Sequence, residues 1–439
     1  MGWVETLLLA LGALLGLMAL GLPVFVAFLI VNLLGIVALF GTRAFGLFAN
    51  SIYETATSES LVAIPLFILL GEILFRSGSV DVLFRAIDTL VGRIRGRLYV
   101  VVVALSTAFG ALSGSAVAVA AMLGRSLLPR MRTRGYDAGL SSAVILGGAS
   151  LAPIIPPSLL VVVVGSLVKN VSIAGLLIAG IGPGLLLGGM MLAYVAFRVW
   201  RRPALAPQDS TRDGETAAPG LREVAHALVS LLPFTLVILS VMGFILAGIA
   251  TPSESAATGV LAAVLVAAIY RRLSLAMLGG ALWEAARLTA IILVIVASSK
   301  LFGQVLSFSG ATRGLVTFVT TLELAPWLML LLLMLVPFVI CMFVDQIAFL
   351  LLAIPLYEPI MQHYGFDPIW FWTLFLINLT IGSLTPPFGY TLFALKGAAA
   401  ELSIAAVFRA AWPVVAVFVF GLLLLALAPG IVTFLPSQF

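Results

Sequence analysis

Residues 146–158, LGGASLAPIIPPS, decide the fold because they form a polar, proline-broken gap in a segment that is otherwise apolar enough to cross a membrane. Pro156 and Pro157 each lack a backbone N–H and crowd the preceding carbonyls, so a helix must unwind there and leave carbonyl oxygens without partners. Within hydrocarbon, unwound backbone is tolerated only beside a cavity or a ligand. The stretch therefore predicts a broken helix that lines a binding site.

The same feature returns at residues 384–389, LTPPFG, where Pro386 and Pro387 lie 230 residues after the first proline pair. Interruptions at matching positions in two halves of a membrane protein are the best sequence indication of a transporter's binding site. We therefore expect two broken helices, one in each half of the chain.

Composition limits the class of protein. Hydrophobic residues make up 62% of the 439 residues and charged residues only 9%, which excludes a soluble globular protein and a disordered one. The apolar runs are longer than the roughly ten-residue alternating strands of an outer-membrane barrel, so an all-α polytopic membrane protein is predicted. One cysteine and two histidines cannot build an internal disulfide or a histidine-based metal centre, and we expect no cofactor.

A repeat relates the two halves, because matched residues recur at a nearly constant offset of 229 to 232 positions. The clearest pair is PRMRTRGYD at residues 129–137 against PIMQHYGFD at residues 359–367. Just before each motif we expect a re-entrant hairpin, the first with Ser113, Gly114 and Ser115 at its tip. The offset places Asp345 where Ser113 stands in the first copy.

The repeat also divides the chain. Residues 1–97 and 226–324 are predicted to be scaffold helices, each ending in an arm, and 98–200 and 325–439 to be the two halves of a transport domain. The polar residues 41–60 are expected to lie outside the core. Residues 201–225, rich in Pro, Asp, Thr and Arg, form the expected linker.

Arginine distribution predicts the orientation. The arm and post-hairpin loop of the first copy carry nine arginines, whereas the aligned stretches of the second carry one, Arg313. The nine are Arg76, Arg85, Arg93, Arg95, Arg97, Arg125, Arg130, Arg132 and Arg134. By the positive-inside rule the first set is cytoplasmic and the second is not, so the repeats are inverted. The linker is then cytoplasmic and both termini face outward.

Each half therefore offers a hairpin tip and a broken helix near the bilayer midplane. Half-helix N-termini can face an anion there, while unwound carbonyls and hydroxyls can bind Na+. The alternative is close helix packing through small residues. The candidate substrate-binding residues are Ser113, Ser115, Pro156, Pro157, Ser158, Pro386, Pro387 and Lys300. The candidate Na+ ligands are Ser113, Gly114, Ser115, Ile155, Asp345, Thr385 and Gly389.

Two charged residues lie inside apolar sequence. Asp345, in CMFVDQIAFLL, is a functional candidate because an ionisable group at membrane depth costs several kcal/mol unless it is compensated. It could equally cap a helix, and the two roles are compatible. Lys300, in IVASSKLFG, could pair with Asp345, meet a substrate carboxylate or extend its ammonium group to an interface.

These motifs together carry a family resemblance. IPLFILLGEILFRSG, the run from SGSAVAVAAMLG to RGYD, LAPIIPPS, IAGIGPG, IATPSESAA, CMFVD and LTPPFGYTLF resemble the large membrane subunit of tripartite ATP-independent periplasmic (TRAP) transporters, the DctM-like family. The resemblance covers nearly the whole chain. It implies an inner-membrane secondary transporter of the ion-transporter superfamily, an inverted-repeat elevator that imports an organic acid with Na+.

The resemblance also implies two partners, a small four-helix membrane subunit and a periplasmic substrate-binding protein. No stretch resembles the small subunit, so we expect it to be a separate chain. A stand-alone Na+-coupled anion symporter of the same superfamily is the first alternative. An intramembrane enzyme is more distant, since Asp345 has no second intramembrane aspartate and neither a Gly-x-Ser-x-Gly elbow nor a nucleotide-binding loop is present. C4-dicarboxylates, sialic and other sugar acids, keto acids and ectoine remain open as substrates.

Overall fold

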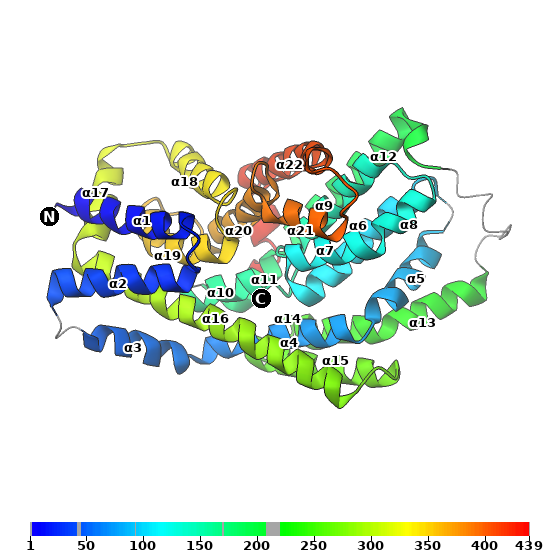
Figure 1. The fold of residues 1–439 in the computed structure, drawn as a ribbon, viewed down its shortest axis with the longest axis horizontal. Coiled ribbons are helices and arrows are strands. Elements are labelled where there is room, and N and C mark those ends of the chain that lie inside the picture. The colour runs from blue at the N-terminus through cyan, green and yellow to red at the C-terminus, as the bar shows by residue number, and fades with distance from the viewer. Residues whose placement is uncertain (1, 42–44, 93, 169–170, 208–219, 439) are drawn as a thin grey trace.

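The computed structural model describes residues 2–41, 45–92, 94–168, 171–207 and 220–438. Arg93 and most of the linker, residues 208–219, lie outside the described part, as do the side chains of residues 79–81 and 111–113. Every regular element in the described part is helical, which confirms the all-α prediction (Figure 1).

The helices follow the repeat. The first copy contains α1 Trp3–Ala19, α2 Val24–Phe40, α3 Phe45–Ala56, η2 Glu59–Val62, α4 Ala63–Arg76, α5 Ser79–Val91, α6 Arg97–Ser113, α7 Ala116–Ser126, α8 Leu128–Thr133, α9 Ala138–Leu151, α10 Leu159–Leu167, α11 Ile173–Ala179, α12 Ile181–Arg201 and η3 Pro203–Leu205. The second contains α13 Leu221–Ile238, η4 Leu239–Gly243, α14 Phe244–Leu246, α15 Pro252–Ile269, α16 Leu275–Phe308, α17 Ala311–Thr321, α18 Pro326–Ile340, α19 Gln346–His363, α20 Pro368–Leu384, α21 Tyr390–Ala398, α22 Ile404–Leu427, α23 Gly430–Thr433 and η5 Pro436–Gln438.

The repeated motif before each broken helix is a helix stop followed by a helix start. Gly135 and Gly365 adopt φ of +82° and +66°, a left-handed conformation that glycine reaches without steric cost. Two residues later an aspartate caps the next helix: Asp137 Oδ1 accepts from Leu140 N at 2.7 Å, and Asp367 Oδ1 accepts from Trp370 N at 2.8 Å. Both copies therefore use the same residues for the same purpose: a glycine ends one helix and an aspartate caps the next.

The expectation that residues 41–60 lie outside the core is wrong in part. Residues 45–56 form α3, which packs along α16 and buries Ser51 and Thr55. The Ser51 hydroxyl donates to Gln304 Oε1 at 3.3 Å, so at least one polar residue of this stretch faces another helix and not solvent. α3 and the helix that follows it are bent by 56° at the break, whereas the matching α16 is a continuous helix of 34 residues.

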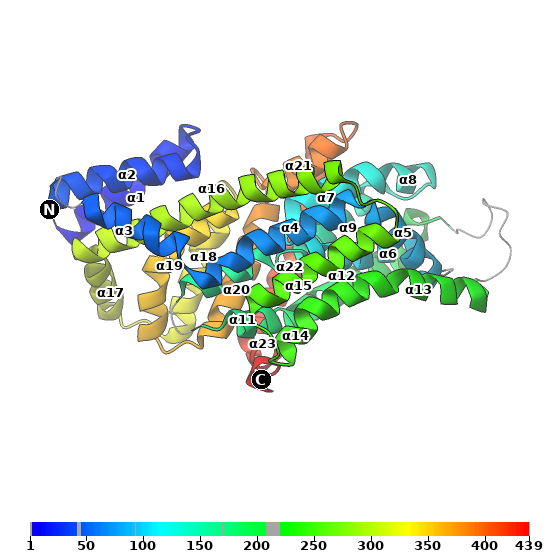
Figure 2. The same ribbon diagram turned by 90° about the horizontal axis from the view of Figure 1, so that it is seen from below.

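Figure 2 shows α4, α15 and α16 running alongside one another over one face of the molecule, where α4 contacts both of the other helices. Five described segments are long and apolar enough to cross a membrane, and the bent pair of residues 46–56 and 59–76 is a sixth candidate. The five are Ile173–Arg201, Leu221–Leu246, Pro252–Ile269, Leu275–Phe308 and Ile404–Leu427.

The two copies exchange contacts in their hairpins and broken helices. α7 lies beside α21 (Figure 1), where a Cβ added at Gly124 would come within 2.8 Å of Leu395 Cδ1. At the end of α21, Arg132 Nη1 pairs with Glu401 Oε1 at 3.1 Å. Conversely, α10, from the broken helix of the first copy, contacts α19 and α20 of the second copy. Each hairpin thus packs on the broken helix of the other copy, so the two halves form one packed unit.

The start of the linker and the C-terminal segment contact opposite ends of α12. Leu205, just beyond the end of α12, accepts hydrogen bonds from Tyr99 Oη at 2.7 Å and Asp137 N at 3.1 Å. At the other end, a Cβ added at Gly182 would lie 2.4 Å from the carbonyl oxygen of Ile431. A helix of this length is about 30 Å long, the thickness of a hydrocarbon core. The division into scaffold and transport halves stays a prediction.

Candidate functional site

Asp345 lies at the tip of the hairpin formed by α18 and α19, where it is the N-cap of α19. Its Oδ1 accepts hydrogen bonds from Ile347 N at 2.9 Å and Ala348 N at 3.1 Å. These two backbone donors satisfy one carboxylate oxygen and hold the side chain over the first turn of α19. The side chain is nevertheless exposed, so the charged group is capped and accessible at the same time.

The broken helix of the second copy holds the other carboxylate oxygen. Tyr390 is the first residue of α21, directly after the break, and its hydroxyl donates to Asp345 Oδ2 at 2.7 Å. The same hydroxyl accepts from Gln346 N. The Gln346 side chain donates to Ser383 Oγ at 2.6 Å, before the break. The hairpin tip is thus fastened to both sides of the interruption, which fixes the direction of the carboxylate.

The break itself folds back tightly. Gly389 N donates to the carbonyl of Thr385 at 3.2 Å, and a Cβ at Gly389 would lie 2.5 Å from the carbonyl oxygen of Ser383. Only glycine fits there, because any side chain would overlap a carbonyl. The Thr385 hydroxyl donates to Ile381 O at 2.7 Å. Thr391, in the first turn of α21, is fully buried, and its Oγ1 has no hydrogen-bond partner among the residues that the structure describes.

The first hairpin meets its own broken helix in the same way. Gly114 adopts φ +62°, and a Cβ added there would lie 3.0 Å from Leu159 N, at the start of α10. Ser115 caps α7, its Oγ accepting from Ala118 N at 3.3 Å. Ser113 ends α6, and its side chain lies outside the described part.

The first break is packed on all sides. Ser158 Oγ donates to the carbonyl of Pro153 and accepts from Val161 N at 3.5 Å, so one of its two lone pairs remains. A Cβ at Gly180 would lie 2.4 Å from the carbonyl of Ile154, and one at Gly184 would lie 2.6 Å from Ile155 Cγ1. The start of α12 therefore closes over the break.

The two breaks differ in exposure although they share their backbone form. The Pro156–Pro157 and Pro386–Pro387 peptide bonds are both cis. Pro156 and Pro157 are buried, whereas Pro387 and Phe388 are exposed beside Asp345. Of the predicted site residues, the structure brings together Gly114, Ser115 and Ser158 in one place and Asp345, Thr385 and Gly389 in another. Their roles as ligands stay predictions.

Lys300 belongs to neither group. It lies half-buried in α16, and both it and Asp345 are described without an ion pair between them. The neighbouring Ser299 hydroxyl donates to the carbonyl of Leu351, and a Cβ at Gly303 would lie 2.9 Å from Pro355 Cβ. The two contacts share one offset, so α16 and α19 run parallel to each other, and Lys300 lies level with a position about seven residues beyond Asp345 along α19.

Tyr390, Ser383 and Thr391 are polar residues of this region that the sequence did not single out. At the offset of 230 that relates the two proline pairs, the counterpart of Tyr390 is Leu160. Because that counterpart is apolar, a comparison of matched polar residues between the copies does not identify Tyr390. The only available signal was its position directly after the LTPPFG break.

Comparison with known sequences gives one consistent result. Residues 11–431 match the family model described as "Tripartite ATP-independent periplasmic transporter, DctM component". The C4-dicarboxylate TRAP transporter large permease protein DctM of Pseudomonas aeruginosa is 32% identical over 89% of each chain. The ectoine/5-hydroxyectoine TRAP transporter large permease protein UehC of Ruegeria pomeroyi is 32% identical over 86% of each chain. The sialic acid TRAP transporter large permease protein SiaM of Vibrio cholerae is 29% identical over 97% of each chain.

Two solved structures share the fold at low sequence identity. The YdaH transporter of Alcanivorax borkumensis has a TM-score of 0.66 at 14% identity, over 90% of each chain. MtrF of Neisseria gonorrhoeae, described as illuminating a class of antimetabolite efflux pumps, has a TM-score of 0.61 at 14% identity, over 90% of this chain and 85% of that one. Both likenesses concern the architecture alone.

Proposed function

Because this chain belongs to the DctM component family of TRAP transporters, we propose that it is the large permease subunit of a Na+-coupled importer of an organic acid. The observation that carries the proposal is the pairing of each hairpin tip with a proline-broken helix, Gly114 against Leu159 and Asp345 against Tyr390. Relatives named for C4-dicarboxylate, ectoine and sialic acid transport define the range of substrates to test.

In the proposed mechanism Na+ binds as a co-substrate at two sites. Hard monovalent cations prefer oxygen ligands, and the second site supplies the Asp345 carboxylate with the Thr385 to Gly389 turn beside it. Thr391, in the first turn after the break, adds a buried hydroxyl oxygen that has no hydrogen-bond partner among the described residues and whose lone pairs are free to bind a cation. The first site, at Ser113, Gly114, Ser115 and Ile155, relies on neutral oxygens. Ser158, the two proline pairs and Lys300 remain candidates for the substrate carboxylate.

Transport would proceed by an elevator motion. The cross-packing of α7 on α21 and of α10 against α19 joins the two hairpins and the two broken helices. Such a unit can slide as one body against the scaffold helices of residues 1–97 and 226–324. Both sites would then move across the membrane without being taken apart.

We further propose an inner-membrane location with the linker cytoplasmic and both termini periplasmic. The contacts of η3 and of Ile431 with opposite ends of α12 support placing the linker and the C-terminal segment on opposite sides, and the nine-to-one arginine distribution supports a cytoplasmic linker. The partners are a small four-helix membrane subunit and a periplasmic binding protein that delivers the substrate. The small subunit should contact the scaffold, because contacts on α9, α10, α20 or α21 would block the sliding unit.

Reconstitution tests the proposal. Purified chain in liposomes should take up a radiolabelled organic acid only with an inward Na+ gradient, and only with the small subunit and the binding protein present. Uptake by this chain alone would favour the stand-alone symporter. Uptake driven equally well without Na+ would contradict the proposed coupling.

A further inference from the structure

One buried hydrogen bond joins the predicted scaffold to the predicted transport domain in the second copy. The Ser299 hydroxyl, on α16, donates to the carbonyl of Leu351, on α19. Ser299 is 4% exposed and Leu351 is fully buried. The bond therefore lies in the interior, where a polar group that loses its partner is left unsatisfied at a cost in free energy.

Pro355 explains why this carbonyl needs a donor from outside its own helix. In an α-helix the carbonyl of residue 351 accepts from the N–H of residue 355, and proline has no N–H. The Ser299 hydroxyl supplies the missing donor. One turn further along α16, Gly303 lets the proline approach, because a Cβ added at Gly303 would lie 2.9 Å from Pro355 Cβ. Hydroxyl, proline and glycine thus form one matched contact between α16 and α19.

The first copy cannot make this contact. At the offset of 232 that relates Ser77 to Ser309, the counterpart of Ser299 is Phe67, which has no hydroxyl. The helix that matches α19 is α7, and its sequence contains no proline. Alternating access in inverted-repeat transporters moves one bundle of helices against the other. Once the two bundles shift, no equivalent bond in the first copy replaces the one that is lost.

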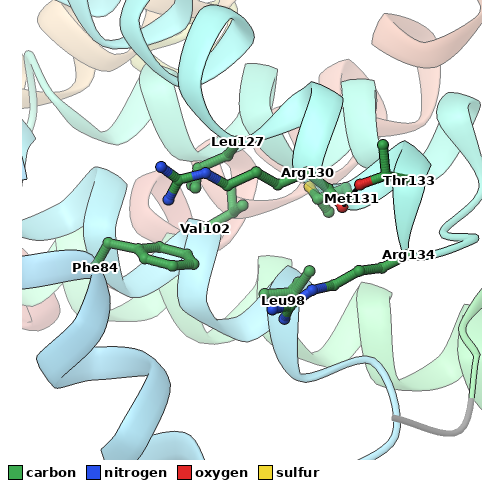
Figure 3. Close-up of a pocket in the computed structure, with 8 residues that line it drawn as sticks. All are labelled: Phe84, Leu98, Val102, Leu127, Arg130, Met131, Thr133 and Arg134. Atoms are coloured by element: carbon green, nitrogen blue, oxygen red, sulfur yellow. Dashed lines mark hydrogen bonds between the residues drawn. The ribbon is translucent and has the colours of Figure 1, made fainter. Parts of the chain in front are cut away.

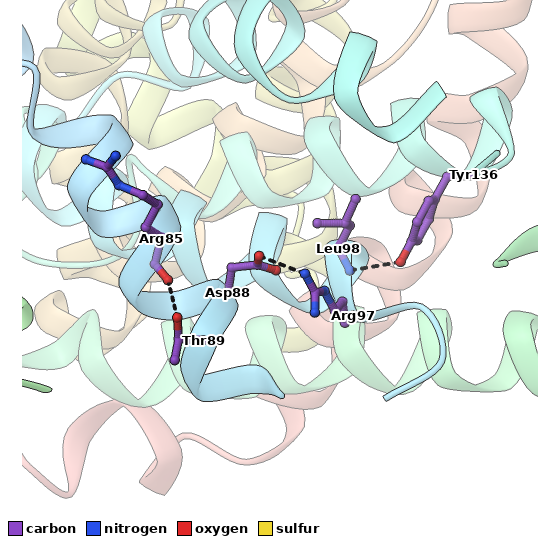
Figure 4. Close-up of polar contacts among 6 residues, drawn as sticks. All are labelled: Arg85, Asp88, Thr89, Arg97, Leu98 and Tyr136. Atoms are coloured by element: carbon purple, nitrogen blue, oxygen red, sulfur yellow. Dashed lines mark hydrogen bonds and ion pairs between the residues drawn. The ribbon is translucent and has the colours of Figure 1, made fainter. Parts of the chain in front are cut away.

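The boundary between the two predicted domains is packed less tightly in the first copy. Phe84 on α5, with Leu98 and Val102 on α6, lines a cavity of about 240 Å³ there (Figure 3). At the start of α6, Arg97 pairs with Asp88 of α5 at 2.9 Å, and both side chains are partly exposed (Figure 4). Side chains that line a void forgo part of their packing contacts. This part of the boundary therefore opposes a relative shift less than the buried α16–α19 contact does.

Ser166, on α10, also reaches across the boundary in the first copy, but its hydroxyl is shared. It lies 3.3 Å from the carbonyl oxygen of Ser60 and 2.7 Å from that of Val162, one turn back in its own helix. A hydroxyl has a single proton to donate, so Ser166 can keep its closer partner when the boundary shifts. The loss on sliding is therefore smaller there than at Ser299.

We propose that Ser299 and Pro355 form a latch that favours the conformation described here over the other end state of the transport cycle. The inference rests on the proposed elevator motion. A slide of one helical turn, about 5.4 Å, carries the Leu351 carbonyl away from Ser299, and Pro355 prevents α19 from satisfying that carbonyl itself. The latch thus sets how often the transporter leaves this conformation, through residues outside both proposed ion sites.

The test measures the distance between the two predicted domains in the purified full chain in lipid nanodiscs. Spin labels on Ala56→Cys, exposed at the end of α3, and Gly397→Cys, with open space around it on α21, report that distance by electron–electron double resonance in a Cys341→Ala background. One distance should dominate in the wild type. Ser299→Ala should shift the ratio of the two end-state populations about tenfold, the effect of one buried hydrogen bond.

Two further variants locate the shift. Pro355→Ala restores an N–H inside α19, so the Leu351 carbonyl has a donor in both end states, and the populations should shift in the same direction as in Ser299→Ala. Ser298→Ala removes the neighbouring buried hydroxyl and is the matched control. The described hydrogen bond of Ser298 is accepted by its carbonyl from Asn32 Nδ2, within the scaffold, so its populations should match the wild type.

Thermal unfolding separates the latch from a purely structural bond. Ser299→Ala leaves a buried carbonyl without a donor and should lower the unfolding midpoint. Adding Pro355→Ala should restore the midpoint, because the new N–H bonds that carbonyl, whereas the populations should stay shifted. A lowered midpoint with unchanged populations in Ser299→Ala would leave only a structural role and overturn the latch. A midpoint that the second substitution does not restore would show that the hydroxyl does not act through Leu351, and would overturn it as well.

If Ser299→Ala does not fold, Pro355→Ala carries the distance measurement alone, and unchanged populations in that variant overturn the latch. Na+-dependent uptake by the reconstituted wild type tests the proposed function separately. Intact uptake with unchanged populations in both variants would contradict the latch alone. Absent uptake with the expected shifts in population would contradict the proposed import and leave the latch standing.

Discussion

The hydroxyl of Tyr390 donates a 2.7 Å hydrogen bond to Oδ2 of Asp345. These residues are 45 positions apart, one at the start of α21 and the other at the tip of the preceding hairpin. The bond therefore connects the hairpin tip with the proline-broken helix, the two features of this half that the sequence marks separately. It makes the direction of the carboxylate depend on the conformation of the proline break.

Tyr390→Phe should weaken Na+ coupling without unfolding the protein. The ring stays, but Asp345 loses the donor to Oδ2 and keeps only its two backbone donors on Oδ1. A hydrogen bond to a charged group contributes about 1.5–3 kcal/mol, and exposure of Asp345 places this one at the lower end. Half-maximal uptake should then need several-fold more Na+. Tyr53→Phe, on an exposed ring of α3, is the matched control and should leave the Na+ dependence unchanged.

Gly114→Ala should damage the first site through its backbone. The left-handed conformation at φ +62° costs an L-residue about 1–2 kcal/mol, and the added methyl would press on Leu159 N at 3.0 Å. We expect a lower unfolding temperature and strongly reduced uptake. Gly189→Ala, on α12 with open space around it, should keep the unfolding temperature and the uptake of the wild type. Equal behaviour of the two variants would show that the tip does not need its contact with the break.

Lys300→Met and Asp345→Asn should have additive effects on transport. The structure describes no ion pair between the two residues. The hydrogen bond from Ser299 to the carbonyl of Leu351 aligns α16 with α19 and places Lys300 beyond the hairpin tip that holds Asp345. The free-energy effects of two substitutions usually add within about 0.5 kcal/mol when the residues share no contact. The measurement is a double-mutant cycle on initial uptake rates. A clear deviation from additivity would mean that the two charges meet during transport.

The topology can be tested with single cysteines in a Cys341→Ala background. Ala204→Cys, at the exposed start of the linker, should react with a membrane-impermeant maleimide only after the inner membrane is permeabilised. Ser437→Cys, in the exposed η5, should react in intact spheroplasts. Labelling of Ala204→Cys from outside would contradict the proposed orientation. The buried Cys341 should itself remain unlabelled in the native protein.

Much of the fold was predictable because the determining signals are local. A proline pair stops a helix wherever it stands, and Gly135 followed by Asp137 ends one helix and caps the next. The same residues recur as Gly365 and Asp367, so both copies could be located. The prediction that residues 41–60 lie outside the core was wrong in part because polar composition was taken as solvent exposure. Ser51 is buried against Gln304, which is 253 residues away, and no local pattern reveals such a partner.

The polar network of the site was less predictable for the same reason. Asp345 was found from its charge and its place in the repeat. Tyr390 and Gln346 act through tertiary contacts, and the first copy holds no polar counterpart of Tyr390. Thr391 becomes notable only when its burial and its unpartnered hydroxyl are both known. Symmetry therefore identifies where the sites lie, whereas the differences between the copies become visible only in the structure.

The most direct test compares Asp345→Asn with Ser113→Ala in Na+-dependent uptake by the reconstituted transporter. The amide keeps the size of the side chain and can still cap α19, so folding and assembly should survive. Removing a charged oxygen ligand should raise the half-saturating Na+ concentration by about tenfold or more, equivalent to roughly 1.4 kcal/mol. Removing the neutral hydroxyl of Ser113 should raise it less. An unchanged Na+ dependence in Asp345→Asn would show that the carboxylate is not a cation ligand, and would contradict the account.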